Sequence, residues 1–116
     1  MRRIGLNLFL VISLSGCPFS KSKKETTSSN TPESALLERG KAVYNANCTA
    51  CHNGNPKLPG SIGPDVYGSS KELLTARIVH GIYPDGYKPK RTSGAMPALP
   101  HLSADIDALT KYLNSN

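Results

Sequence analysis

Two cysteines and a histidine stand within five residues, and this short segment constrains the chain more than any other feature. Residues 48–52 read C-T-A-C-H. A C-x-x-C pair occurs in thioredoxin-like redox sites, but these need a βαβ context, and none is visible here. The pair could also form a disulfide, or half of a structural zinc site, which needs four ligands. His52, His80 and His101 could supply nitrogen ligands, yet the chain has no second cysteine pair.

The histidine directly after the second cysteine favours another chemistry, the covalent attachment of haem. Thiols three residues apart, on Cys48 and Cys51, can reach the two vinyl groups on neighbouring edges of one porphyrin. The next residue, His52, then projects its imidazole over the ring toward the iron. We therefore predict one covalent haem c, held by both cysteines, with His52 as an iron ligand.

A buried haem would also provide the large apolar core that this chain otherwise lacks. Residues 53–68 and 82–101 are rich in Gly and Pro and show no long periodic pattern. Helical spacing predicts three short helices, at about 32–46, 70–80 and 103–114, and no convincing strand. Short helices and long loops without any Trp make a poor core in a small domain. The expected fold is all-α, with about three helices and Gly/Pro-rich loops around one haem.

Capping residues predict where these helices begin and end. Thr31 is placed to cap the first helix, and Ser103 the last. Ser69 and Glu72 have the capping-box spacing at the start of the second helix, and Gly81 is placed to end it.

The N-terminal residues predict export. A basic start is followed by an apolar run over residues 4–14, as in a secretory signal. The run is too short to span a bilayer as a helix, which needs about 20 residues. Residues 14–17 read L-S-G-C and resemble the lipobox of bacterial lipoproteins, which implies cleavage before Cys17 and lipid on that cysteine. The alternative is an ordinary signal peptide with a chance cysteine near its end.

These observations divide the chain into three parts. Residues 1–16 are expected to be a lipoprotein signal peptide, and residues 17–30 a lipidated cysteine followed by a polar, flexible tether. Residues 31–116 are expected to form the haem domain. The mature protein would then be lipid-anchored to a bacterial membrane, facing the periplasm or the cell exterior.

Charge adds little to this interpretation. The formal net charge is +6, a mild basic bias without the aromatic-and-basic interleaving of nucleic-acid-binding proteins. Lys57, Lys88, Lys90 and Arg91 flank the loops expected around the haem edge. They could steer an acidic redox partner, or they could be an ordinary solvated rim.

From residue 33 to residue 113 the chain resembles the small monohaem class I cytochromes c. Gly40, Tyr44 and Cys48 match the family's G-x-x-x-aromatic-x-x-x-C-x-x-C-H pattern. The resemblance implies that the first helix crosses the last one at Gly40 and Tyr44, with Leu109 and Tyr112 as partners. A glycine at such a crossing lets two helix backbones approach closely.

Two further segments carry the same resemblance. Residues 63–68 read G-P-D-V-Y-G and resemble the family segment in which a proline carbonyl accepts a hydrogen bond from the histidine ligand. The resemblance implies this role for Pro64 toward His52, although Gly-Pro alone is only a turn signal. Residues 94–97 read G-A-M-P and resemble the family's distal loop, which implies Met96 as the second iron ligand.

Other side chains compete for roles near the iron. A lone methionine is often core filler, so Met96 has a packing alternative. His80 and His101 are rival ligands by residue type. Three tyrosines are candidates to line the pocket, with packing as their default role: Tyr67, Tyr83 and Tyr87.

The cytochrome c resemblance implies a carrier of single electrons with His/Met iron ligation, and not an enzyme in its own right. The signal-like N-terminus and the lipobox resemblance add that this carrier is extracytoplasmic and membrane-anchored. Its expected partners are electron donor and acceptor proteins, and the membrane through the lipid on Cys17. One alternative is a cytochrome c subunit of a larger oxidase, reductase or dehydrogenase complex. Another is a haem sensor or peroxidase-like protein with an open iron position.

Overall fold

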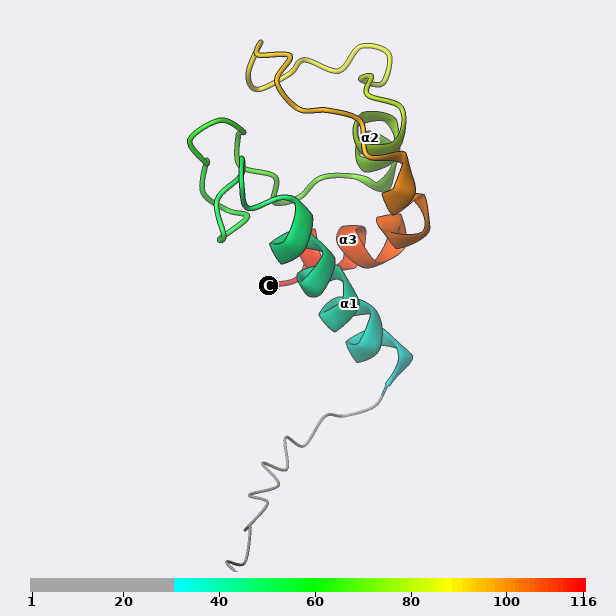
Figure 1. Ribbon diagram of the computed structural model, residues 1–116. Helices are drawn as coiled ribbons and strands as arrows, with labels where there is room; N and C mark the ends of the chain where they lie inside the picture. Colours follow the sequence, from blue (N-terminus) through cyan, green and yellow to red (C-terminus); the bar gives the residue numbers. More distant parts are fainter. Residues whose placement is uncertain (1–30) are drawn as a thin grey trace, which may run out of the picture.

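The computed structural model describes residues 31–116, and every regular element in this range is helical (Figure 1). The absence of strands from these residues confirms the predicted all-α class. Among residues 31–116, no helical stretch combines the length and the apolar character that a transmembrane segment requires. The predictions for residues 1–16, for Cys17 and for the tether lie outside the described residues. The elements, in chain order, are α1 (Pro32–Asn47), α2 (Lys71–Leu74), a π-helical turn η1 (Thr75–Val79), a 3₁₀ helix η2 (Pro100–Asp105) and α3 (Ile106–Leu113).

Helix α1 begins as its capping residue predicts. The side-chain oxygen of Thr31 accepts a hydrogen bond from the backbone N–H of Ser34 at 3.3 Å, and Pro32 occupies the first helical position. At the other end, the backbone N–H of Cys48 still donates to the carbonyl of Tyr44 at 2.9 Å. The first cysteine of the C-x-x-C-H segment therefore directly follows the last turn of α1.

The predicted cap of the second helix is wrong by one residue. Ser70 is the N-cap, and its hydroxyl oxygen accepts from the backbone N–H of Leu73 at 3.1 Å. The hydroxyl of Ser69 instead donates to the carbonyl of Val66 at 2.6 Å. Because Ser69 is committed to the preceding loop, it cannot form the expected capping box with Glu72.

The second helix also changes its hydrogen-bonding pattern along its length. After α2 the chain widens into the π-helical turn η1. The carbonyl of Ile78, in that turn, accepts a hydrogen bond from the backbone N–H of Leu99 at 2.6 Å. Gly81, with a φ of +71°, then ends the helical stretch as predicted. The widened turn thus provides a hydrogen-bond acceptor for a segment that lies some twenty residues later in the chain.

The start of the last helix differs from the prediction. Ser103 is not a cap, because it lies inside η2, and α3 begins only after Asp105. The carboxylate of Asp105 makes no capping bond. It accepts instead from Nε of Arg39 on α1 at 2.8 Å, so a contact between helices replaces the local one.

Helices α1 and α3 cross at Gly40. A Cβ atom on this glycine would lie 2.0 Å from the carbonyl oxygen of Ala108 and 2.8 Å from Cβ of Tyr112. One turn further along α1, the ring of Tyr44 packs against the ring of Tyr112, with centroids 5.4 Å apart. Leu109 and Tyr44 are each only 1% exposed. The expected crossing is therefore present, with the backbone of Ala108 as an additional partner.

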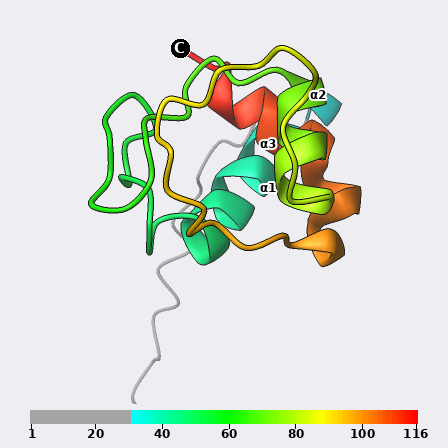
Figure 2. The same cartoon turned by 90° about the horizontal axis from the view of Figure 1, so that it is seen from above.

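The core draws on all the helical segments, and the loops lie beside it. In Figure 2 the green loop lies to one side of the helices, and the yellow loop passes in front of α2 before it runs alongside the green one. The described side chains that are fully buried are all apolar apart from the Tyr44 hydroxyl, which donates to the carbonyl of Asn53 at 2.6 Å. The buried cluster comprises Val43, Tyr44, Leu74, Ile78, Leu102, Ile106, Leu109 and Leu113.

Candidate haem site

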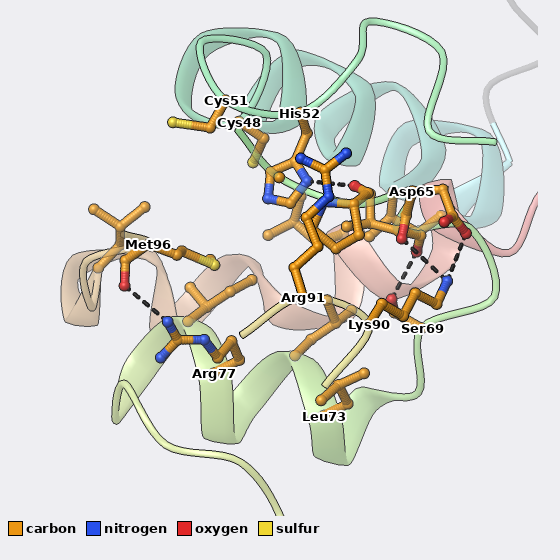
Figure 3. Close-up of a pocket in the computed structure, with 18 of the residues that line it drawn as sticks. Cys48, Cys51, His52, Asp65, Ser69, Leu73, Arg77, Lys90, Arg91 and Met96 are labelled. Carbon is orange, nitrogen blue, oxygen red and sulfur yellow. Dashed lines mark hydrogen bonds and ion pairs between the residues drawn. The ribbon is translucent and has the colours of Figure 1, made fainter. Parts of the chain in front are cut away.

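A cavity lies between the helices and the two long loops, and it brings the sequence-predicted site residues together. Cys48, Cys51, His52, Pro64 and Met96 all line it. Figure 3 shows Cys48 and His52 on one side of this space and the thioether of Met96 reaching toward it from the opposite side. The remaining wall is largely apolar and includes core residues of every helix: Tyr44, Leu74, Ile78, Leu102, Leu109 and Leu113.

The C-x-x-C-H segment forms a tight turn at the end of α1. The carbonyl of Cys48 accepts from the backbone N–H groups of Cys51 at 3.2 Å and His52 at 2.9 Å. Both cysteines are unpaired and partly buried. Burial raises the pKa of the Cys48 thiol to about 11, so at neutral pH it is not the thiolate that a thiol–disulfide redox site needs.

Two alternative readings of the cysteines find no support in this geometry. Residues 31–116 contain no group of three or more His, Cys, Asp or Glu side chains that could hold a metal ion, which argues against a zinc site. The same residues contain no disulfide between the two cysteines. What the turn offers is two separate thiols and an imidazole beside an apolar cavity.

The imidazole of His52 is fixed by a backbone contact. Its Nδ1 lies 2.8 Å from the carbonyl oxygen of Pro64. A carbonyl can only accept, so Nδ1 is the donor in this contact, and in the neutral ring Nε2 keeps its lone pair. This is the contact that the family resemblance implied for Pro64.

Gly63 makes room for this ring. A Cβ atom there would lie 2.4 Å from Cε1 and 2.5 Å from Nδ1 of His52. The sequence indicated Gly63 only as a member of the G-P-D-V-Y-G segment and not as a contact of His52, because a steric requirement between residues eleven positions apart leaves no local signal.

Arg77 supports the loop on the opposite side of the cavity. Its guanidinium donates to the carbonyl of Met96 at 2.9 Å and to that of Gly81 at 2.6 Å. It also lies over the ring of Tyr83, 4.9 Å from the centroid. Sequence reasoning missed Arg77, which lies at a helical position with no motif around it.

The rival side chains are placed differently from Met96. His80 and His101 are exposed and do not line the cavity. Tyr83 and Tyr87 line it, with their rings stacked at a centroid distance of 5.4 Å. Tyr67 does not line the cavity, and its hydroxyl donates to the side chain of Asn116 at 3.2 Å.

Three of the four basic residues expected around the cavity make contacts within the chain. Lys90 pairs with the carboxylate of Asp65 at 2.5 Å, and the hydrogen bond from Lys90 lowers the pKa of that carboxyl. Arg91 donates to backbone carbonyls of residues 60–62. Lys57 lies over the ring of Tyr67, 4.5 Å from the centroid. Among the described residues Lys88 has no ion pair or hydrogen bond.

The residues present fit haem c. Two unpaired thiols stand at the C-x-x-C-H spacing, the imidazole has its Nε2 available, and a soft thioether faces the same space. The apolar lining suits a large porphyrin and keeps water from its faces.

Comparisons with known proteins agree with this assignment. Residues 35–113 match the model of the family described as cytochrome c oxidase, cbb3-type, subunit III. The chain is similar to a cytochrome c-553-like protein of Synechocystis sp., with 29% identity over 77 residues that cover 66% of this chain and 63% of that protein. It is also similar to cytochrome c6 of Cyanidium caldarium, with 29% identity over 110 residues that cover 94% of this chain and 92% of that protein.

A third relative is much longer. The chain is 39% identical over 87 residues to lupanine 17-hydroxylase [cytochrome c] of Pseudomonas sp., and the match covers 71% of this chain but only 11% of that protein. The chain thus spans less than two thirds of the length of this relative and of the cytochrome c-553-like protein. No solved structure matches the chain.

Proposed function

Because this chain belongs to the cytochrome c family, through a domain of the type found as subunit III of cbb3-type cytochrome c oxidase, we propose that it is a single-electron carrier. Haem c, bound covalently through Cys48 and Cys51, supplies a one-electron iron couple. The carrier takes an electron from one protein and gives it to another, and no substrate is transformed.

The observation that carries this proposal is the fixed orientation of the His52 imidazole. Its Nδ1 is committed to the Pro64 carbonyl at 2.8 Å, so Nε2 is the nitrogen available to iron. Met96 lines the same cavity from the other side and would supply the second ligand. With His52 and Met96 both bound to it, the iron would have no open site for a substrate, which would suit electron transfer. A methionine ligand favours ferrous iron and so raises the reduction potential.

The carrier is proposed to work outside the cytoplasm, on a membrane. The signal-like residues 1–16 and the lipobox-like segment before Cys17 support export and lipid attachment. Substituting Cys17→Ser should release the haem protein from the membrane fraction, while the conservative Ser20→Thr, in the polar segment that follows, should leave it membrane-bound. A Cys17→Ser protein that stays with the membrane would refute the anchor.

Optical spectroscopy of the haem-loaded protein tests the ligand assignment. The wild type should be six-coordinate and low-spin, with the weak long-wavelength band of sulfur–iron bonding in its oxidised form. That band should vanish in Met96→Ala and persist in Leu99→Ala, a matched truncation at a nearby residue that also lines the cavity. A band that persists in Met96→Ala would show that Met96 is not the ligand.

The same samples test the alternative of an open iron site. A carrier with both positions filled should not bind carbon monoxide when reduced at neutral pH, whereas Met96→Ala should. Rapid binding by the reduced wild type would favour a sensor or peroxidase-like protein.

A second candidate function is that of a cytochrome subunit in a larger redox complex. It is supported by the family description, which names an oxidase subunit, and by the match to part of the much longer relative named lupanine 17-hydroxylase [cytochrome c]. Purification from membranes in mild detergent distinguishes the two. A stoichiometric redox partner would favour the subunit, and recovery of the haem protein alone would favour the free carrier.

A further inference from the structure

Two adjacent basic residues tie together the loops on either side of the cavity. We propose that Arg91, assisted by Lys90, is a positioning residue for His52: it holds the Pro64 loop in place and thereby keeps the imidazole in its hydrogen bond. The inference rests on the proposed function, in which His52 is an iron ligand.

Arg91 contacts the Pro64 loop through three consecutive carbonyl groups. Its Nη1 lies 2.8 Å from the carbonyl oxygen of Ile62 and 3.4 Å from that of Ser61. Its Nη2 lies 3.1 Å from the carbonyl oxygen of Gly60. A planar guanidinium can serve several acceptors at fixed angles, which a lysine ammonium cannot do in the same way.

The segment that Arg91 holds is packed directly on the C-x-x-C-H turn. The backbone N–H of Gly63 donates to the carbonyl of Cys51 at 2.9 Å. A Cβ atom on Gly60 would lie 2.3 Å from the same carbonyl oxygen, and one on Gly63 would lie 2.4 Å from the His52 ring. Any movement of residues 60–63 would therefore change the position of the imidazole.

Lys90 holds the loop on the other side of Pro64. Its ammonium lies 2.5 Å from Oδ2 and 3.1 Å from the carbonyl oxygen of Asp65. The two basic residues thus secure the backbone both before and after Pro64, whose carbonyl accepts from His52. Figure 3 shows Arg91 and Lys90 in front of the cavity, on the side where His52 and Asp65 lie.

The hydrogen bonds of Arg91 go to residues 60–62 and not to His52, so its proposed effect passes through the loop backbone. A hydrogen bond at Nδ1 fixes the ring orientation and raises the basicity of the ligand nitrogen. Loosening the loop would open this bond more often and expose the Nδ1 proton to water. Exchange of that proton with solvent therefore reports on the proposed role, independently of electron transfer.

The test compares three variants of the haem-loaded protein by proton NMR of the His52 ring. We expect the Nδ1 proton of Arg91→Met to exchange about tenfold faster than that of the wild type. This factor corresponds to about 1.4 kcal/mol, close to the lower end of the range for hydrogen bonds to a charged group. Arg91→Lys keeps the charge but loses the planar fork, and should exchange at an intermediate rate.

Lys88→Met is the matched control. It removes a positive charge three residues earlier in the same loop, where the side chain has no ion pair or hydrogen bond among the described residues, and its exchange rate should equal that of the wild type. The inference is overturned if Arg91→Met exchanges no faster than Lys88→Met. If Arg91→Met does not fold, Arg91→Lys decides, and a wild-type rate in it overturns the inference.

The optical spectrum separates this failure from a failure of the proposed function. If the Arg91 variants have attached, low-spin haem with the spectrum of the wild type, and their exchange rate is unaltered, only the role of Arg91 is refuted. If His52 does not bind iron in the wild type, the proposed function itself is refuted.

Discussion

Replacing Gly40 by alanine should destabilise the protein, although alanine is the better helix former. At an unconstrained helical position this change would stabilise the fold by about 1 kcal/mol. At Gly40 the added Cβ would lie 2.0 Å from the carbonyl oxygen and 2.6 Å from the carbonyl carbon of Ala108. Both are backbone atoms, so no side-chain rotation can relieve the contact.

The magnitude follows from what must move. Helices α1 and α3 have to separate, which weakens the packing of Tyr44 on Tyr112 and of the fully buried Leu109. Overpacking of this kind costs about 1–3 kcal/mol and occasionally more. Since the contact is with backbone, we take the upper end and subtract the gain in helix propensity, which leaves a net loss of about 2 kcal/mol. In a domain of this size that loss lowers Tm by about 8–16 °C.

Thermal unfolding of the haem-loaded protein, followed by far-ultraviolet circular dichroism, measures this effect. Gly54→Ala is the matched control, because nothing lies within 4 Å of a Cβ at that position, and its Tm should stay near that of the wild type. A Tm of Gly40→Ala equal to or above the wild-type value would refute the close crossing of α1 and α3.

Three further predictions concern the cavity and the ion pairs. Gly63→Ala should displace the His52 ring, since the new Cβ would lie 2.4 Å from it; optical spectra should show loss of the low-spin state, and a wild-type spectrum would contradict the steric account. Arg77→Met removes two hydrogen bonds to backbone carbonyls and should cost about 2 kcal/mol in denaturant unfolding; an unchanged unfolding midpoint would show that these bonds contribute nothing. Acid should weaken the fold because three carboxyls have a lowered pKa in the folded protein. The folded state therefore binds fewer protons than the unfolded state, and it loses this stability as the pH falls below the ordinary pKa values of Glu, 4.5, and Asp, 3.8. Unfolding midpoints measured from neutral pH downward check this, and a midpoint that rises on acidification would contradict the sign. The three carboxyls are those of Glu33, Asp65 and Asp105, each hydrogen-bonded by a basic side chain, Lys111, Lys90 and Arg39 respectively.

Local sequence signals predicted the fold where local contacts decide it. The cap at Thr31 and the positive φ at Gly81 are properties of one turn of chain, and both were predictable. The predicted cap at Ser103 is wrong, because the chain forms a 3₁₀ helix there and Asp105 pairs with Arg39 on another helix. Helix boundaries that depend on a distant partner carry no signal in the nearby residues.

The residues of the site also fall into those that the sequence could indicate and those that it could not. The motif around His52 and the segments around Pro64 and Met96 are each a continuous stretch of chain, so the sequence could indicate all three. The contacts of Arg77 with Met96 and of Arg91 with Gly60 join residues 19 and 31 positions apart. They depend on how the loops fold back over the cavity, which no spacing in the sequence reports.

The mass of the protein after denaturation tests the central claim most directly. The protein should be made in cells that can attach haem, purified, and denatured under conditions that extract non-covalent haem. We expect each chain to keep its colour and to carry the added mass of one haem, and a Cys48→Ala, Cys51→Ala double variant to carry none. A wild-type chain that is colourless and has only the mass of the polypeptide with its lipid would contradict the account.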